Sequence, residues 1–151
     1  MPILKAMSAT FRTCLNVVAF LALHYAASDL LLGGAGTVDQ AIAWLPTGVA
    51  VAGLWLLGLR FWWVVALSTF LQRQANGYAV VLSILPAIGS SLEGMFGALL
   101  LRRFQFRAEF ARLRDALALL AVAILAPLIS VFVGSLNHYL QGPVPSPFVS
   151  G

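Results

Sequence analysis

The chain alternates between long apolar stretches and very short polar breaks. A helix needs about 20 residues to cross a hydrocarbon core of about 30 Å, and most of these stretches approach that length. The pattern predicts an all-α fold: a polytopic integral membrane helix bundle with about five transmembrane helices. We place the spans at about 11–32, 40–59, 61–75, 78–101 and 115–140, within a single domain that covers residues 1–151.

Glycine, proline and polar residues mark the limits of these spans. The glycine cluster at 33–36 ends the first span, and Asn76-Gly77 is a turn sequence between the third and fourth. Pro46 is tolerated in the first turn of the second span, whereas Pro127 should kink the fifth. The third apolar segment has only about 11 residues, half of a span. The polar residues 72–74 must therefore face a polar cavity or thin the bilayer.

Composition supports a lipid environment. Hydrophobic residues make up 61% of the chain, charged residues 9%, and the mean hydropathy is +0.94. A soluble domain of 151 residues has too little interior to bury that much apolar surface. The net charge is +4, but the basic residues lie at the ends of apolar segments rather than among aromatics on a polar face. Nucleic acid is therefore excluded as a partner.

The basic residues also predict the orientation. Lys5 and Arg12, then Arg60, then the arginines of 102–114 lie at alternate connections, which places them on one side of the membrane. The positive-inside rule makes that side cytoplasmic, with the N-terminus inside. Only Arg73 falls on the other side. Residues 104–114 carry aromatic or apolar residues at helical spacing with arginines between them, so this segment is expected along the inner membrane surface.

Both ends of the chain leave alternatives open. The apolar run after Arg12 is also compatible with a signal peptide cleaved near 26–28, but hydrophobicity resumes at 30–32, which favours an uncleaved first helix. Five spans with the N-terminus inside put Gly151 outside. A cytoplasmic output domain would then need a further span, so the chain is interpreted as either a fragment or a truncated relative of a larger protein.

Three stretches together resemble the MASE1 family. They are Trp44-Leu-Pro-Thr-Gly, Ile88-Gly-Ser-Ser-Leu-Glu-Gly, and Arg112-Leu-Arg-Asp followed by Ala126-Pro-Leu-Ile-Ser, within roughly residues 40–142. The resemblance implies a bacterial membrane-associated sensor domain of the inner membrane, of the kind that precedes histidine kinases, as in two-component systems, and diguanylate cyclases. It implies no enzymatic activity for this chain and no ligand. The Trp-rich continuation typical of the family and the kinase or cyclase module are absent from this sequence.

Glu93 is the first candidate for a ligand or switch residue. A carboxylate inside a span is costly and normally faces the bundle interior or water. Small residues on the same helix are expected to let the helices around it approach closely, and with the Pro127 kink they would provide two packings of similar energy. Two interpretations remain open: a structural carboxyl that fixes helix packing, or a group linked to a ligand or proton. The predicted packing residues are Gly89, Ser90, Gly94, Gly97 and Pro127.

A second group of candidates gathers toward the predicted outer side. An Asp29–Arg73 ion pair would neutralise the one basic residue that breaks the inside rule. In the alternative interpretation, Asp29 caps its helix or snorkels, and His138 lies in the headgroup region. The outer candidates for ligand contact or switching are Asp29, Trp44, Pro46, Arg73, Asn137 and His138.

The remaining chemistry-bearing residues are few. His24 lies in mid-span, and a lone histidine there is more often hydrogen-bonded to a neighbour than bound to a metal. Cys14 has no partner cysteine for an intrachain disulfide. We find no catalytic constellation in the sequence and expect neither a metal nor a cofactor.

These observations predict a non-catalytic sensory domain. In this hypothesis the partners are the lipid bilayer and either a small ligand or another membrane protein, engaged in a cavity bounded by the first, second, fourth and fifth helices. The alternative is a small transporter or channel subunit, in which Asp29, Arg73 and Glu93 would line a polar path. A structural assembly partner is a third possibility.

Overall fold

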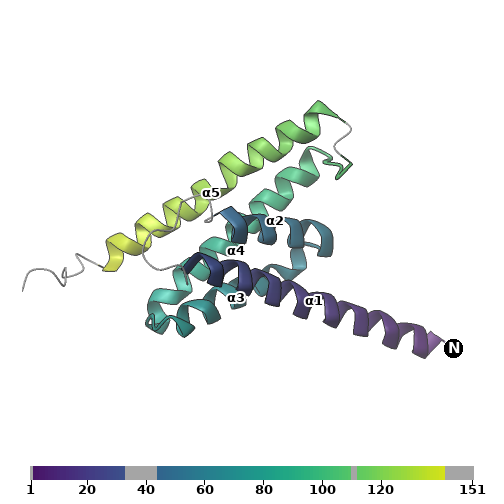
Figure 1. Cartoon of the computed structure of the whole chain (residues 1–151), viewed down its shortest axis with the longest axis horizontal. Helices are drawn as coiled ribbons and strands as arrows, with labels where there is room; N and C mark the ends of the chain where they lie inside the picture. Colours follow the sequence, from purple (N-terminus) through teal and green to yellow (C-terminus); the bar gives the residue numbers. More distant parts are fainter. Residues whose placement is uncertain (1, 33–43, 110–111, 142–151) are drawn as a thin grey trace, which may run out of the picture.

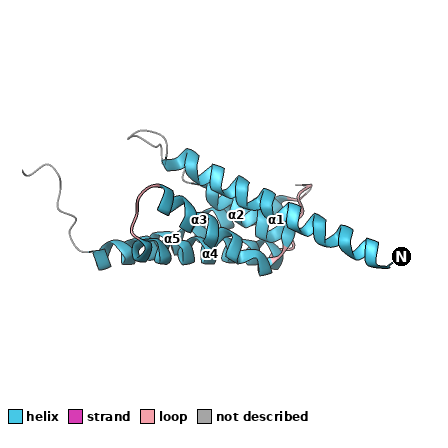
Figure 2. Ribbon diagram, turned by 90° about the horizontal axis from the view of Figure 1, so that it is seen from below, coloured by secondary structure: helices cyan, strands magenta, loops and turns pink. Residues whose placement is uncertain are grey.

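The computed structural model describes residues 2–32, 44–109 and 112–141, and these ranges contain α-helix and no β-strand (Figures 1 and 2). The all-α prediction is therefore confirmed. The glycine cluster at 33–36, the predicted start of the second span at 40–43 and the C-terminal tail lie outside the described residues. The elements are α1 (Pro2–Leu32), α2 (Trp44–Leu57), the 3-10 turn η2 (Leu59–Phe61), α3 (Trp62–Ala75), α4 (Val80–Arg103) and α5 (Leu113–Gln141).

Helices α1 and α3 run parallel. His24 on α1 is hydrogen-bonded to Ser68 on α3, and Ser28, one turn later on α1, accepts a bond from Gln72, one turn later on α3. Both contacts join residues 44 positions apart, which is possible only if the two helices advance in the same direction.

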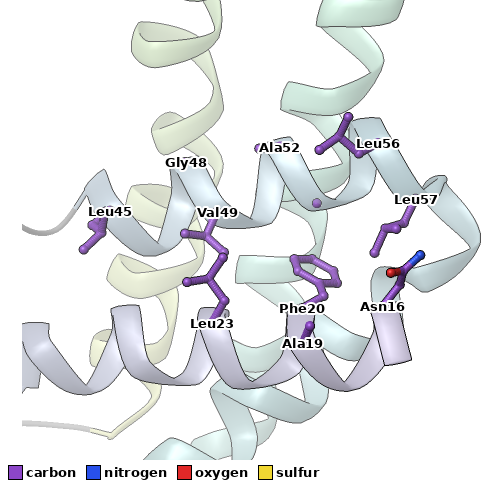
Figure 3. A pocket seen from close by; sticks show the side chains of 11 residues that line it. Asn16, Ala19, Phe20, Leu23, Leu45, Gly48, Val49, Ala52, Leu56 and Leu57 are labelled. Atoms are coloured by element: carbon purple, nitrogen blue, oxygen red, sulfur yellow. The ribbon is translucent and has the colours of Figure 1, made fainter. Parts of the chain in front are cut away.

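Helices α4 and α5 run antiparallel. Gly89 near the start of α4 packs against Val133 in the second half of α5, whereas Gly97, two turns later on α4, packs against Val122 in the first half of α5. Figure 3 shows α1 and α2 side by side in opposite directions. Helices that follow one another along the chain thus alternate in direction, as spans joined by short connections would.

Within the part of the chain that the structure describes, two helices are long and apolar enough to cross a membrane: Val80–Arg103 and Leu113–Asn137. Leu45–Leu57 is a shorter apolar helix. Only 17% of the most apolar window of the fifth helix is buried, and Phe132 on it is 72% exposed. The core helix of a soluble protein would be mostly buried, so this outward apolar surface is consistent with a helical membrane bundle.

Helix α3 is short for its position. Its 14 residues extend about 21 Å at 1.5 Å per residue, less than the hydrocarbon core. The polar residues Gln72 and Gln74 nevertheless lie in its last turn, and Gln72 is buried against α1. Gln72 and Gln74 thus bond to neighbouring helices, α1 and α4 respectively, an arrangement that neither of the two sequence-based possibilities described.

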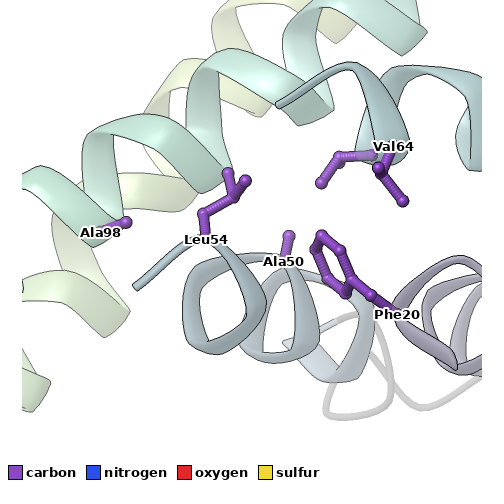
Figure 4. Close-up of a cluster of buried hydrophobic side chains, with 6 residues drawn as sticks. Phe20, Ala50, Leu54, Val64 and Ala98 are labelled. Carbon is purple, nitrogen blue, oxygen red and sulfur yellow. The ribbon is translucent and has the colours of Figure 1, made fainter. Parts of the chain in front are cut away.

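Helix α4 lies at the centre of the packing, with α2, α3 and α5 around it (Figure 1). One buried cluster joins α1 to α4, and Figure 4 shows the Phe20 ring of α1 pointing toward Ala50 of α2. A second cluster joins α2, α4 and α5. The first contains Phe20, Ala50, Leu54, Val64, Val65 and Ala98, and the second contains Val51, Leu101, Val122 and Ala126.

The segment after α4 differs from its sequence interpretation. Residues 104–109 form turns rather than a continuing helix. Gln105 adopts a left-handed conformation with φ 51°, the Phe106 amide donates to the Leu101 carbonyl (3.0 Å), and the Gln105 amide donates to that of Arg102 (3.0 Å). This pair of bonds is a Schellman motif, which ends a helix and turns the chain aside. Phe106 packs against α2 instead of continuing an apolar helix face, and the centres of its ring and the Trp55 ring are 5.6 Å apart.

Candidate functional site

Glu93 lies on the inner face of α4 and is 5% exposed. Its Oε1 accepts a hydrogen bond from Thr47 Oγ1 on α2 (2.7 Å), and its Oε2 accepts one from Ser130 Oγ on α5. One carboxyl group therefore joins three helices. We call Thr47, Glu93 and Ser130 the Glu93 junction.

Three glycines on α4 flank the junction and bring the helices close. A methyl group added at Gly97 would lie 2.5 Å from Val51 Cγ2 on α2, and one added at Gly89 would lie 2.7 Å from Val133 Cγ1 on α5. A methyl group added at Gly94 would lie 3.0 Å from Ala50 Cβ on α2. Close backbone approach between membrane helices depends on such small residues. The polar bonds of the junction are thus surrounded by tight contacts.

Two prolines lie beside the hydroxyl partners of Glu93. Pro46 is the third residue of α2 and precedes Thr47, and Pro127 lies within α5, one turn before Ser130. Proline has no amide hydrogen, so a proline inside a helix leaves one carbonyl of the preceding turn without its usual partner. Ser90 is half-buried on α4. The switching and packing roles of these residues stay predictions.

The junction does not involve α1, contrary to the predicted cavity among four helices. The Glu93 carboxyl is bonded by α2 and α5, while α1 packs on the other side of α2 and on α3. Between α1 and α2 the structure has instead an open apolar groove of about 530 Å³, with Asn16 at one end and Leu45 at the other (Figure 3). Phe20 and Gly53 both line this groove, and the Phe20 ring occupies the space beside the Gly53 backbone.

A second polar contact joins α1 and α3. His24 Nδ1 lies 2.9 Å from Ser68 Oγ, Gln72 Nε2 donates to the Ser28 carbonyl (3.2 Å), and Ser28 Oγ donates to the His24 carbonyl (2.9 Å). All four residues are buried. We call them the α1–α3 seam. Sequence reasoning expected a hydrogen-bonded His24 but missed its partners, although both pairs of polar residues are four positions apart on their helices.

Asp29 and Arg73 do not form the ion pair that is one of the two interpretations drawn from the sequence. No ion pair joins these two residues among the side chains that the structure describes: Asp29 is exposed, and the Arg73 guanidinium lies 4.1 Å from the centre of the Tyr78 ring. The position facing α1 is taken by Gln72, and the next residue is rotated about 100° around the helix. Arg73 Nε is buried without a hydrogen-bond partner.

The other outer candidates are not brought to Glu93 by any described contact. Asn137 is half-buried near the end of α5. The side chains of Trp44 and His138 lie outside the described part of the structure. Within the described residues no group of three or more His, Cys, Asp or Glu side chains is placed to hold a metal ion, and Cys14 is exposed on α1.

Comparison with known proteins gives one match. The family model MASE1 matches residues 12–151, which is most of the chain and begins earlier than the resemblance seen in the sequence motifs. No curated protein and no solved structure matches significantly.

Proposed function

This chain belongs to the MASE1 family of membrane-associated sensor domains, and from this premise we propose that it is the signal-input domain of a bacterial signalling protein. In this proposal the chain itself catalyses no reaction. It passes a stimulus to a histidine kinase or diguanylate cyclase module that is not part of this sequence.

The proposed topology has five spans, with the N-terminus and the arginines of 102–114 on the cytoplasmic side of the inner membrane. Support comes from the alternating directions of the helices, from two helices that are long and apolar enough to span, and from the side on which the basic residues gather. The short α3 fits if its polar end stays below the outer surface, covered by α1.

The Glu93 junction is the proposed switch. Glu93 lies on α4 and is the only described group that α2 and α5 both bond through side chains. Loss of the Thr47 bond would let α2 shift relative to α4 while α5 stays bonded. Loss of the Ser130 bond would let α5 shift while α2 stays bonded. A ligand, or a second membrane protein, that favours one of two such packings would shift their populations by its differential affinity. Outer residues such as Asp29, Arg73 and Asn137 are proposed ligand contacts.

The observation that carries this proposal is the pair of bonds from two helices to one carboxyl group, and the test is to remove each bond. The chain would be fused to a diguanylate cyclase domain and its basal cyclic dinucleotide output measured in cells. Glu93→Gln keeps the shape of the side chain but turns one acceptor oxygen into a donor. We expect it to change basal output several-fold, and Thr47→Val and Ser130→Ala to change output as well.

Ser91→Ala is the matched control. Ser91 is buried on the same helix, but its hydroxyl donates to the Ala87 carbonyl of α4 and joins no other helix (2.9 Å). Its output should equal that of the parent fusion at equal expression. Unchanged output in all three junction variants would refute the switch role of Glu93.

A further inference from the structure

We propose that the connection between α4 and α5 binds anionic phospholipid headgroups at the inner membrane surface. This inference rests on the inside-facing orientation proposed above. It concerns residues 102–115, which carry five arginines against Glu109 and Asp115.

The described part of this connection has a defined fold. The Schellman motif turns Phe106 inward, where it packs on Trp55 of α2. Asp115, fully buried in the first turn of α5, accepts a hydrogen bond from the Arg107 amide through Oδ1 (3.2 Å). The described backbone is therefore held by these contacts at the end of α4 and at the start of α5, which limits the positions that the arginine side chains can take.

The structure divides the five arginines into two kinds. Arg102 Nη2 donates to the carbonyls of Leu54 (3.3 Å) and Trp55 (3.5 Å), so it holds the C-terminal end of α2. The other four are exposed, and no described ion pair or side-chain hydrogen bond engages them. These are Arg103, Arg107, Arg112 and Arg114.

The apolar neighbours of these arginines favour a lipid over an acidic protein segment. Phe104 is 44% exposed and Leu113 is 78% exposed, and each is next to an arginine at a helix end. An acidic, water-soluble protein segment would offer carboxylates to the arginines but no apolar surface for these side chains. The headgroup region accepts both apolar side chains and guanidinium groups. The planar guanidinium fork binds phosphate oxygens in a bidentate geometry, as it does carboxylates, so the exposed apolar neighbours are what favour the headgroup.

Binding here would act on the proposed switch. The arginines lie at the end of α4 and at the start of α5, the helices that carry Glu93 and Ser130. A headgroup bridging the two helix ends would fix their spacing. The anionic lipid content of the inner leaflet would then set how readily α5 moves relative to α4.

The test is native mass spectrometry of the detergent-purified chain with equal amounts of phosphatidylglycerol and phosphatidylcholine. The parent chain should retain phosphatidylglycerol preferentially. Each arginine near a charged lipid surface contributes about fivefold in affinity, so Arg107→Gln with Arg114→Gln should weaken retention by about 25-fold. Lysine at the same two positions should keep most of it, because the charge and the membrane topology are preserved.

Two single variants provide controls. Arg60→Gln removes one cation from the other inside connection, where Arg60 lies over the Phe61 ring, and should weaken phosphatidylglycerol retention by no more than about fivefold, well short of the double glutamine variant. Arg102→Gln should lower thermal stability and leave selectivity intact. Equal retention of the two lipids by the parent, or an unaltered preference in the double glutamine variant, would overturn the proposal.

Two further arms identify the ligand. Displacement of the lipid by inorganic phosphate at comparable concentration would assign the site to a soluble anion. Binding of polyglutamate without binding of phosphatidylglycerol would assign it to an acidic protein segment. Both results would overturn a headgroup site. Because lipid retention needs no signalling output, its failure is distinguishable from failure of the Glu93 switch.

Discussion

The Glu93 junction and the α1–α3 seam are both buried polar contacts between helices, but they are built differently. The seam joins two parallel helices at two successive turns, through an imidazole and a hydroxyl at one turn and a side-chain amide and a backbone carbonyl at the next. The junction joins three helices through one carboxyl group. Displacing α1 from α3 breaks bonds at two successive turns, whereas at the junction the bond to α2 and the bond to α5 can each be lost without the other.

The packing around the two contacts differs in the same sense. The junction is flanked by Gly89, Gly94 and Gly97, where the helices approach with few side chains between them. The seam is covered on one side by the Phe20 ring, which meets His24 edge-on. We infer that α1 and α3 move as a unit and that rearrangement takes place among α2, α4 and α5.

Filling the space beside the junction should have the largest effect. Gly97→Leu introduces a side chain where even a methyl group would lie 2.5 Å from Val51, so α2 must move away from α4. We expect a loss of about 2–3 kcal/mol in the free energy of unfolding, the usual size of overpacking effects. The measurement is a titration from mild detergent micelles into sodium dodecyl sulfate, followed by tryptophan fluorescence.

Gly134→Leu is the control for this substitution. Gly134 is also a helical glycine, but nothing lies within 4 Å of a methyl group added there. Its effect should stay within about 0.5 kcal/mol, as for other surface changes. Similar losses at Gly97 and Gly134 would show that α2 and α4 are not closely packed at the junction.

Double-mutant cycles should show a smaller effect, a difference in coupling free energy between the two contacts. Interhelical hydrogen bonds in membranes average about 0.6 kcal/mol and reach about 1.7 kcal/mol. We expect the lower value for His24–Ser68, measured with His24→Leu and Ser68→Ala. Thr47–Glu93, measured with Thr47→Val and Glu93→Met, should lie nearer the upper value, because this bond is 2.7 Å long and lies beside tight helix contacts. A larger coupling at the seam than at the junction would contradict this ranking of the two bonds.

The sequence predicted the helices closely because apolar length and turn residues are local signals. The spans expected at 78–101 and 115–140 correspond to α4 at Val80–Arg103 and α5 at Leu113–Gln141. Glu93 was also recognisable, since a carboxyl group within an apolar segment is conspicuous. Whether all five helices cross a membrane stays a prediction.

The partners of the polar residues were not predictable in the same way. Thr47 and Ser130 are unremarkable in their own helices, and only the packing of α2 and α5 against α4 brings them to Glu93. The choice between the two interpretations of Asp29 and Arg73 has the same origin. Both residues were placed at the correct end of their helices, but which side of α3 faces α1 depends on the partner helix rather than on local sequence. The four-residue spacing of Ser68 and Gln72 was the available signal.

The smallest expected effects concern the helix ends that support each contact, which use the same motif with different residues. Helix α3 ends with Gly77 at φ 79°, and the Tyr78 amide donates to the Arg73 carbonyl (3.1 Å). Helix α4 ends with Gln105 at φ 51°. A side chain in this left-handed region costs about 1 kcal/mol, which glycine avoids. Gly77→Ala should therefore destabilise the chain by about 1 kcal/mol.

Gln105→Gly should have the opposite sign and raise the free energy of unfolding by about 0.5–1 kcal/mol, less the greater flexibility that glycine gives the unfolded chain. Both variants are measured in the same detergent titration. If Gln105→Gly destabilises instead, the Gln105 side chain contributes a contact at the inner surface that outweighs its backbone strain. The α4–α5 connection would then be held by more than Phe106 and Asp115. A gain in stability would instead mean that these two residues, with the Schellman bonds, are sufficient to hold it.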